Sequence, residues 1–547
     1  MSANASGNGQ GGAFGGNQGG ARGDGAAPAA LQRAIMLHQG GRLAEAARLY
    51  RDALRQAPRH PLALHFLGLL HCQQGNFKDA VPLIEQAVAA KHDYVEAHYN
   101  LGKALQSLGR HRDAARSYER ALALKPDYAD ARYNLGSALL ALDQNDAAAA
   151  QFEKLLASDP AYPGAHNNLG SALKALDRHE PALRHFQAAV RLNAADADAR
   201  YNLALMLLDM NRQEESIAEY DRVLAARPGD ADAITNKGFA LLALGRLKEG
   251  LPLFHGTTGR DPALRPRGRD VPLWRGEAEI RGKTLWVQDD QGFGDVIQSL
   301  RYVAALRSRG VEVLLQVKPP LADLARRSFP GVRIMTAEPP DADYRVPCMA
   351  LPLALQTDSE TDIPRDCPYL TADPDRAAAW RARLHARHPR AVAFAWRGNP
   401  DQANDRNRSM PLAALAPLFA CPGVEFVCVQ KGLSAAETAT LGEFPNVVAL
   451  DAELASFDDT AAVLSAVDLV ATVDTSVAHL AGALARPLWV MLAFNADWRY
   501  FVGRRDWPWY PTATLIRQRT HGDWAGVVDE VRRCLLETPP GKMGEAP

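Results

Sequence analysis

Three capping residues follow an apolar, β-rich segment late in the chain. Residues 469–473 read LVATV, the pattern expected of a parallel strand that is buried on both faces. Asp474, Thr475 and Ser476 come directly after it, and all three are residue types that cap the start of a helix. A helix that begins there directs unpaired N–H groups and about half a positive charge at a ligand above the strand. The expected ligand is a phosphate or a diphosphate.

The helix expected after these residues, 477–485, is rich in Ala and Leu and ends before Pro487. His479 lies in its first turn, close enough to add a hydrogen-bond donor to the same site. The alternative interpretation needs no ligand, because the capping residues can serve only to start the helix while His479 packs beside it.

A second strand, turn and helix are expected at 285–306, where the sequence QDDQGFGD separates two apolar segments. Gly292 and Gly294 let the backbone turn sharply and approach a ligand. The sequence is neither GxGxxG nor a P-loop, so by itself it supports a nucleotide site only weakly. Asp295 falls at the expected helix start, where the macrodipole favours a carboxylate. Asp295 is therefore either a capping acid or a group that does chemistry.

Both elements belong to an expected α/β region. From residue 284 onward, short apolar strands alternate with helices, which is typical of parallel sheets covered by helices. The segment 373–390 separates two series of strands. We therefore predict two Rossmann-like halves, an acceptor-side half at 284–372 and a donor-binding half at 373–540. Their ligand site is expected in a cleft at the carboxyl ends of the strands.

The first half of the chain repeats itself. Between 27 and 266 a 34-residue period gives seven countable units. Small residues recur where the two helices of one hairpin must approach closely. The pattern resembles the tetratricopeptide repeat, which stacks into an α-solenoid whose groove usually binds a protein or peptide. The small residues are Gly68, Gly102, Gly136, Gly170, Ala204 and Gly238 in the first helices and Ala46, Ala80, Ala114, Ala148 and Ala182 in the second.

An asparagine occupies the same position in five successive repeats. An amide both donates and accepts hydrogen bonds, so a row of amides suits the backbone of an extended peptide. The row resembles one in the repeat half of the eukaryotic O-linked N-acetylglucosamine transferase. The alternative is that these amides only join adjacent helices, and the solenoid can also be a spacer or an oligomerisation arm. The row comprises Asn100, Asn134, Asn168, Asn202 and Asn236.

Composition argues against several classes of partner. The chain of 547 residues carries 62 basic and 63 acidic side chains, so its net charge favours neither nucleic acid nor an anionic membrane. It has no apolar segment of membrane-spanning length and no apolar signal segment, and its six cysteines form no CxxC pair. We expect free thiols, no metal site and a cytoplasmic protein. Residues 1–26 are expected to be a disordered Gly-rich tail and 267–283 a linker.

Two motifs taken together resemble a known family. The pairing of GFGDVIQSLRYVAAL with VDTSVAHLAGALARP is similar to family 9 glycosyltransferases, which include the ADP-heptose lipopolysaccharide heptosyltransferases. The stretch from about 284 to 536 resembles more closely the glycosyltransferase-like domain attached to tetratricopeptide repeats in many bacterial proteins. The resemblance implies a GT-B fold and an inverting, metal-independent transfer from a nucleotide-diphosphate sugar, with no further cofactor.

The resemblance also implies roles for single residues. Asp295 matches the acceptor base of the family pattern, and the motif from Asp474 to His479 matches its donor-diphosphate site. A metal-free enzyme of this kind must neutralise the departing diphosphate with N–H groups and cations. Arg408 and Lys431, each following a strand of the second half, are candidates for those cations, and the alternative is that both are solvated surface residues.

Ser476 departs from the family motif, which usually has glycine at that place. This difference motivates a second interpretation, a tetratricopeptide adaptor whose α/β half has lost transfer. A heptosyltransferase-type enzyme of surface glycans is a third. A nucleotide-sugar enzyme such as an epimerase is a fourth, although the chain lacks a GxGxxG motif that would hold a nicotinamide. The favoured interpretation is a glycosyltransferase whose solenoid recruits the acceptor, for example a protein.

Overall fold

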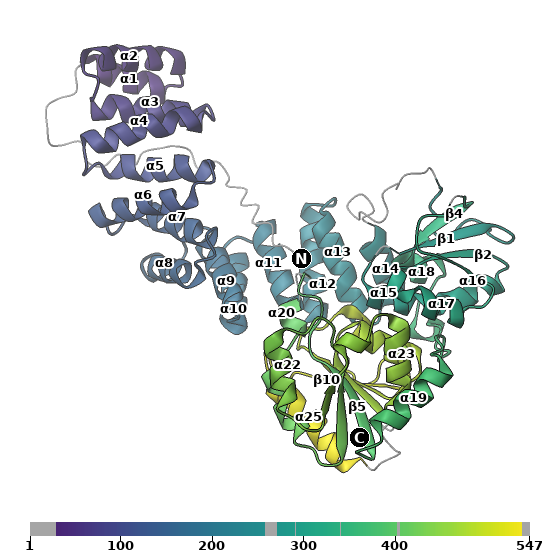
Figure 1. Ribbon diagram of the computed structural model, residues 1–547. Coiled ribbons are helices and arrows are strands. Elements are labelled where there is room, and N and C mark those ends of the chain that lie inside the picture. Colours follow the sequence, from purple (N-terminus) through teal and green to yellow (C-terminus); the bar gives the residue numbers. More distant parts are fainter. Residues whose placement is uncertain (1–28, 257–270, 290, 340, 402–404, 539–547) are drawn as a thin grey trace. The chain divides into compact units, whose positions relative to one another are not determined.

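The computed structural model describes residues 29–256, 271–289, 291–339, 341–401 and 405–538 (Figure 1). The tail predicted at 1–26 lies outside these ranges. The chain forms two compact units, one ending at Met206 and the other beginning at Leu207. The boundary falls within α11, inside the predicted repeat region.

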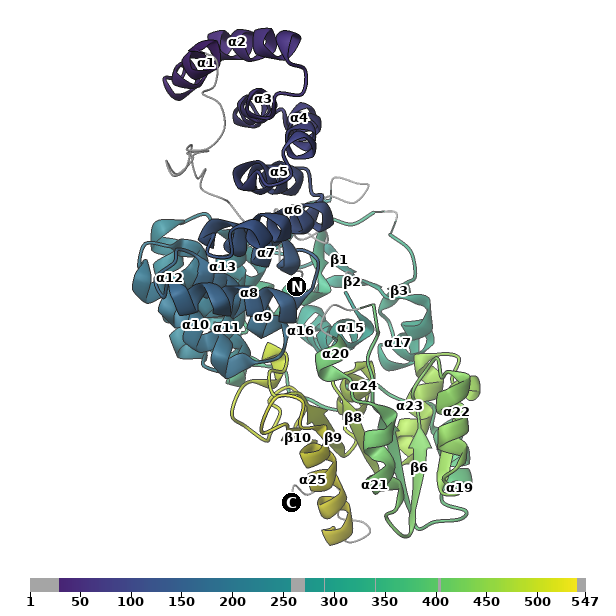
Figure 2. The same cartoon turned by 90° about the vertical axis from the view of Figure 1, so that its left-hand side faces the viewer.

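Consecutive helices of the repeat region pair as hairpins. Fourteen helices give the seven units that the 34-residue period predicts. Figure 2 shows the first of them following one another in chain order. The helices are α1 (Ala29–Gln39), α2 (Leu43–Gln56), α3 (Pro61–Gln73), α4 (Phe77–Ala90), α5 (Val95–Ser107), α6 (His111–Leu124), α7 (Ala129–Leu140), α8 (Asn145–Ser158), α9 (Ala165–Ala175), α10 (His179–Leu192), α11 (Ala197–Asp209), α12 (Gln213–Ala226), α13 (Ala231–Ala243) and α14 (Leu247–Gly256).

Glycines in the first helix of a hairpin lie against large side chains of the second helix. A Cβ added to Gly102 would lie 2.5 Å from the Tyr118 ring, and one added to Gly136 would lie 2.6 Å from the Phe152 ring. Both separations are shorter than van der Waals contact, so a larger residue would push the helices apart. The predicted reason for the small residues is therefore confirmed. Ala46, Ala80, Ala114, Ala148 and Ala182 of the second helices are fully buried.

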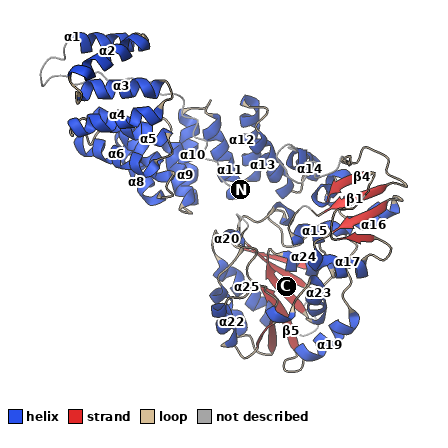
Figure 3. Cartoon of the chain, turned by 45° about the horizontal axis from the view of Figure 1, so that its top comes forward, coloured by secondary structure: helices blue, strands red, loops and turns tan. Residues whose placement is uncertain are grey.

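The α/β region contains two parallel sheets, as predicted (Figure 3). The first has the strand order β3-β2-β1-β4 and the second β10-β9-β8-β5-β6-β7. The edge strands β4 and β10 were not predicted. Strand β4 reads YRVP, in which an arginine and a proline leave no apolar run, so its sequence signal is weak. The strands are β1 (Thr284–Gln288), β2 (Glu312–Gln316), β3 (Arg333–Met335), β4 (Tyr344–Pro347), β5 (Arg390–Ala395), β6 (Val424–Cys428), β7 (Val447–Ala449), β8 (Leu469–Val473), β9 (Leu488–Leu492) and β10 (Ala513–Arg517).

Helices connect these strands. The helix expected to follow the glycine-rich turn is divided, because a 3-10 turn (Leu300–Tyr302) separates α15 from α16. The helices of the region are α15 (Phe293–Ser299), α16 (Val303–Ser308), α17 (Ala322–Ser328), α18 (Leu351–Ala354), α19 (Pro374–Leu384), α20 (Asp405–Arg408), α21 (Ala416–Phe419), α22 (Ala435–Gly442), α23 (Phe457–Ala466), α24 (Ser476–Ala483) and α25 (Trp524–Glu537).

The last repeat shares a hydrophobic core with the first sheet. Leu242 of α13 and Leu251 of α14 belong to the same buried cluster as Trp274. The Val502 N–H also donates a hydrogen bond to the Ala243 carbonyl at 2.9 Å. Helices α13 and α14 are therefore part of the second compact unit, together with both sheets.

The described part of the predicted linker is packed against the first sheet. Leu273 forms an isolated bridge with Arg345 of β4, and the Trp274 N–H donates to the Arg345 carbonyl at 2.8 Å. The Trp274 side chain is buried. Residues 272 to 274 of this segment thus pair with β4 at the edge of the first sheet.

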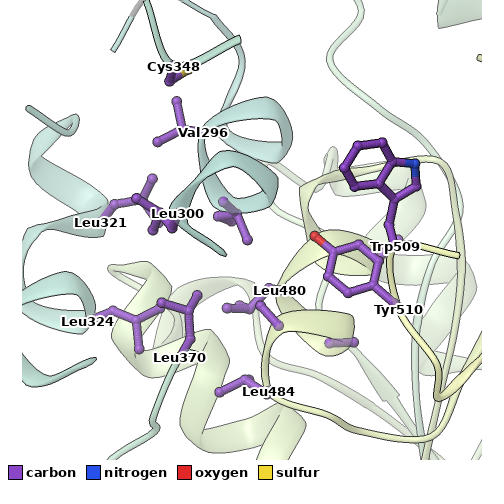
Figure 4. Packing of buried hydrophobic residues seen from close by; sticks show 14 of the residues in the cluster. Val296, Leu300, Leu321, Leu324, Cys348, Leu370, Leu480, Leu484, Trp509 and Tyr510 are labelled. Carbon is purple, nitrogen blue, oxygen red and sulfur yellow. The ribbon is translucent and has the colours of Figure 1, made fainter. Parts of the chain in front are cut away.

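Helices α15 and α24, one from each half of the α/β region, lie against each other. Figure 4 shows Leu300, which directly follows α15, between Val296 of α15 and Leu480 of α24, and all three belong to one buried cluster. Helix α15 follows β1 and α24 follows β8. The contact therefore brings the carboxyl ends of strands from the two sheets together.

Candidate functional site

The strand-to-helix junction after β8 is present near the middle of the second sheet. Strand β8 lies between β5 and β9, and α24 begins at Ser476, one residue before the expected start. Thr475 is the N-cap, and its Oγ1 accepts a hydrogen bond from the Val477 N–H at 3.2 Å. The helix N-terminus thus stands at the carboxyl edge of the sheet, which is where open α/β sheets bind ligands.

His479 is buried between α24 and the aromatic segment that precedes β10. Its Nδ1 lies 3.2 Å from the Tyr510 hydroxyl, and its ring centroid lies 5.3 Å from that of Trp507. Burial lowers the pKa of His479 well below its usual value, and the positive charges of nearby arginines act in the same direction. The imidazole is therefore neutral at pH 7.

Gly294 lies directly against His479. A Cβ on Gly294 would lie 2.8 Å from the Cδ2 of His479, so only glycine permits this approach of α15 to α24. Gly292 is the N-cap residue of α15, with extended backbone dihedral angles. In the structure Gly294 thus brings the backbone close to a histidine of the other half.

Arg499 joins Asp295 to the second half. Its Nη2 lies 3.0 Å from the Asp295 Oδ1, and its Nη1 lies 2.8 Å from the Asp497 Oδ1. Nη2 also lies 3.5 Å from the sulfur of Met349. The arginine is buried, and within the described ranges its Nε has no hydrogen-bond partner. Asp295 is therefore paired with a residue outside its own helix, because the Arg499 guanidinium contacts one of its carboxylate oxygens.

Asp474 faces the same group of charges. The Tyr500 hydroxyl donates a hydrogen bond to the Asp474 Oδ1 at 2.7 Å. Burial raises the pKa of Asp474 to about 6, and the like charge of Asp497 adds to this effect. The Tyr500 hydrogen bond and the nearby arginines oppose the shift without cancelling it. Asp474 consequently changes charge near neutral pH.

Arg408 is brought to this edge by the chain after β5, the strand next to β8. Its guanidinium packs on Gly398, where an added Cβ would lie 2.5 Å from Nη2, and its Nε lies 3.2 Å from Asp405 Oδ1. Its charge acts on the ionisation of both Asp474 and His479, as expected of a cation near the end of β8. The structure thus places Arg408 with the junction residues.

Lys431 has a different position. It follows β6, and its Nζ forms an ion pair with the Asp451 Oδ1 at 2.8 Å. The lysine side chain is 57% exposed, which fits the solvated alternative better than a role beside Asp474.

The asparagine row joins adjacent repeats. The Asn134 Nδ2 donates to the Tyr99 hydroxyl at 3.2 Å, and the Asn168 Nδ2 donates to the Tyr133 hydroxyl at 3.1 Å. The Asn100 Nδ2 lies 3.0 Å from the His65 Nε2, the Asn202 Nδ2 lies 2.9 Å from the Asn167 Oδ1, and Asn236 is buried. The amide donors are thus used between repeats. Within residues 29–256, the amide oxygens of Asn100, Asn134 and Asn168 accept no hydrogen bond.

The sequence predicts that the aromatic, arginine-bearing segment after β9 packs the terminal part of the chain, with stacking on a base or sugar as the alternative. Asp497, Arg499 and Tyr500 lie within four consecutive residues and contact Asp295 or Asp474, or each other. Their position just beyond a strand at the carboxyl edge of the second sheet was an available signal. Their partners were not readable from the sequence, because those partners lie in distant segments.

Among the helices that the structure describes, none is both long enough and apolar enough to cross a lipid bilayer.

Comparisons with known proteins address the repeat region. Residues 27–52, 62–127, 99–166 and 167–231 match tetratricopeptide repeat families. Protein FlbA of Caulobacter vibrioides is 29% identical over 308 residues, which is 50% of this chain and 50% of FlbA. The chain therefore spans about half the length of this curated relative.

Similar solved structures are repeat proteins of low identity. They include YrrB, described as a TPR protein with an unusual peptide-binding site, with 19% identity, 35% of this chain and 98% of its own covered, and a TM-score of 0.32. A tetratricopeptide repeat protein from Parabacteroides merdae has 18% identity, covers 44% of this chain and 93% of its own, and has a TM-score of 0.36. The N-terminal part of the chain thus consists of tetratricopeptide repeats, and two parallel α/β sheets follow it.

Proposed function

We propose that the α/β region transfers a sugar from a nucleotide-diphosphate sugar to an acceptor that the tetratricopeptide repeats recruit. One observation carries the proposal. The contact between α15 and α24 gathers Asp295, Asp474, Arg408 and Arg499 at the carboxyl ends of two parallel sheets. These side chains come from separate segments, and a shared site gives a reason for their convergence.

The donor diphosphate would bind at the N-terminus of α24. Unpaired N–H groups at a helix start and a guanidinium are the groups that stabilise a diphosphate as negative charge develops on it. Arg408 supplies the guanidinium, since its charge already acts on Asp474. The resemblance to family 9 glycosyltransferases supports the same placement and an inverting, metal-independent reaction.

Asp295 would take the proton from the acceptor hydroxyl. The carboxylate is orientated by Arg499 through Oδ1, which leaves Oδ2 to accept a proton. Asp295 is about a quarter exposed, at 27%, so a substrate can reach it. A general base must lie within hydrogen-bond reach of the proton that it removes, and an orientated carboxylate meets that requirement.

The repeats would hold the acceptor, for which we propose a protein. Tetratricopeptide repeats suggest protein binding, and an amide oxygen in each of three successive repeats accepts no hydrogen bond from the described residues. Such acceptors suit the N–H groups of an extended peptide. The repeats would then supply the acceptor while the α/β region supplies the donor.

The test separates donor binding from chemistry. UDP-, GDP- and ADP-sugars are titrated into the full-length protein by calorimetry, and donor hydrolysis and transfer are then followed with the sugar that binds. Asp295→Asn should retain donor affinity while turnover falls by about 100-fold or more. Asp323→Asn, which changes an exposed aspartate of α17, is the matched control and should behave as the wild type.

Two results would contradict the proposal. If no nucleotide sugar binds, the proposed assignment of the donor site is wrong. If a sugar nucleotide binds but neither wild type nor variant turns it over, the protein is an adaptor with an inactive α/β region, which is the interpretation that Ser476 motivated.

A further inference from the structure

Arg301 is buried, and its charge acts on His479. Among the residues described it has no carboxylate partner. Arg301 donates hydrogen bonds to the carbonyls of Gln298 and Trp509 at 2.9 and 2.6 Å, and its Nη2 donates to the Tyr369 hydroxyl oxygen at 3.4 Å. Its guanidinium also lies 4.5 Å from the centre of the Tyr510 ring. The arginine therefore fixes the positions of Tyr369 and Tyr510.

These two tyrosines form a hydrogen-bonded chain that ends at His479. The Tyr369 hydroxyl donates to the Ile297 carbonyl of α15 at 3.0 Å. It also lies 3.0 Å from the Tyr510 hydroxyl, which in turn lies 3.2 Å from the His479 Nδ1. Figure 4 shows the Tyr510 ring beside the packed helices of the site.

Counting protons sets the direction of every bond in this chain. A tyrosine hydroxyl has one proton, and that of Tyr369 is given to Ile297. Tyr510 must therefore donate its own proton to the Tyr369 oxygen. With that proton used, the Tyr510 oxygen can only accept a hydrogen bond from the His479 Nδ1.

His479 is consequently held as the neutral tautomer with its proton on Nδ1. The other ring nitrogen, Nε2, then carries a lone pair and no proton. The ring edge that bears Nε2 faces the first turn of α15, since a Cβ on Gly294 would lie 3.4 Å from Nε2. Asp295, the proposed base, is the next residue after Gly294. The Nε2 lone pair therefore faces the segment that carries the proposed site.

We propose that the His479 Nε2 accepts a hydrogen bond from a hydroxyl group of the donor sugar. This assignment rests on the proposed function for its ligand, whereas the tautomer rests on the hydrogen bonds alone. A lone pair repels phosphate oxygens, so it cannot bind the diphosphate as the sequence led us to expect. His479 lies about one helical turn beyond the N-terminus of α24.

The tautomer can be measured in the free protein. Nitrogen NMR of the full-length protein labelled in histidine distinguishes a protonated from an unprotonated ring nitrogen, and the His479→Gln variant assigns the signal. We expect a protonated Nδ1 and a bare Nε2 in the wild type. A protonated Nε2 in the wild type would overturn the inference directly, whatever the variants do.

Tyr369→Phe should invert the tautomer. Without the Tyr369 oxygen, the proton of Tyr510 can go only to the His479 Nδ1, and the histidine proton then moves to Nε2. Tyr302→Phe is the matched control, because Tyr302 is buried nearby and its hydroxyl contacts Thr357 at 2.9 Å, outside this chain. An unchanged tautomer in a folded Tyr369→Phe protein would overturn the proposed direction of the bonds.

Binding measurements distinguish two roles for His479, which either accepts a hydrogen bond from a sugar hydroxyl or donates one to a phosphate. His479→Asn keeps a donor at the place of Nδ1 but has no group at the place of Nε2. Calorimetry should show unchanged affinity for inorganic pyrophosphate and about tenfold weaker binding of the nucleotide sugar. Loss of pyrophosphate affinity would overturn the assignment and make His479 a phosphate donor. If the wild type binds neither ligand, the proposed function fails together with the sugar contact, while the NMR result still decides the tautomer.

Discussion

At the scale of single residues, the site is a set of charges held in unusual states by their surroundings. Asp295 is paired with a buried arginine, and His479 is a neutral acceptor. Asp474 is the residue whose charge depends most directly on pH near neutrality, because burial and Asp497 raise its pKa to about 6. Because the folded state disfavours the ionised form of Asp474, ionisation of this carboxyl at higher pH lowers the stability of the protein.

The pH dependence of Asp474 can be tested by removing its charge. Its pKa is raised from 3.8 to about 6 on folding, so its contribution to stability is full below pH 4 and is lost as the pH rises through about 6. A shift of this size corresponds to roughly 3 kcal/mol at most. Because Asp474 keeps partial exposure, we expect Asp474→Asn to be more stable than the wild type by about 1 to 2 kcal/mol at pH 7.5.

The measurement is urea denaturation at pH 7.5 and at pH 4. At the lower pH most of the difference should disappear, since Asp474 is then protonated in the folded chain and partly protonated in the unfolded chain. Asp323→Asn serves as the exposed control. A difference for Asp474→Asn that does not shrink toward pH 4 would show that the charge of Asp474 is not its cause.

At the scale of elements, the contact between α15 and α24 decides whether the site exists. Each helix follows a strand, and their first turns touch at Gly294 and His479. Glycine was expected here because it lets the backbone approach a ligand. In the structure its role is to let one helix approach the other, which places Asp295 beside Arg499.

Gly294→Ala should separate the two helices. The added methyl would lie 2.8 Å from the His479 Cδ2, and the buried ring has little room to move. We expect a loss of about 1 to 3 kcal/mol in stability, measured by urea denaturation, and weaker binding of nucleotide sugars.

Gly442→Ala provides the comparison for this prediction. Gly442 ends helix α22, and an added Cβ there meets nothing within 4 Å. This variant should be as stable as the wild type or slightly more so, because alanine has the higher helix propensity. Equal stability of the two variants would mean that the approach of α15 to α24 does not require glycine.

At the scale of the whole chain, the last repeat belongs with the sheets. Leu242, Leu247 and Leu251 of α13 and α14 are buried in the cluster that contains the strands of the first sheet. Tetratricopeptide units commonly form a separate solenoid in which each contacts its neighbours. In this chain the final unit also covers part of the α/β region.

Removing that unit should therefore prevent the α/β region from folding. A protein that begins at residue 197 retains α11 to α14 and should be monomeric, with a cooperative thermal transition. A protein that begins at residue 257 lacks the three leucines, each worth roughly 2 kcal/mol when buried, and exposes the apolar surface that they cover, so it should aggregate. Size-exclusion chromatography and calorimetry would measure both. A folded, monomeric shorter protein would show that α13 and α14 only rest against the sheets.

The sequence by itself determined the architecture of this protein. The 34-residue period and its small residues predicted seven hairpins, because each repeat contacts mainly its neighbours and its pattern is local. The alternation of strands and helices predicted two parallel sheets for the same reason, although the short strand β4 left too weak a signal. The capping residues after β8 likewise predicted where α24 starts, to within one residue.

Only the tertiary structure decided what each candidate residue contacts. Arg499 pairs with Asp295. Tyr369 contacts Tyr510, which contacts His479. Lys431 forms an ion pair with Asp451. The Arg499–Asp295 and Tyr369–Tyr510 contacts join segments from different halves of the α/β region, and nothing in the local pattern of either segment encodes its partner. The tautomer of a histidine depends on the whole chain of hydrogen bonds behind it, so it is a property of the packed fold and not of the residues that flank it.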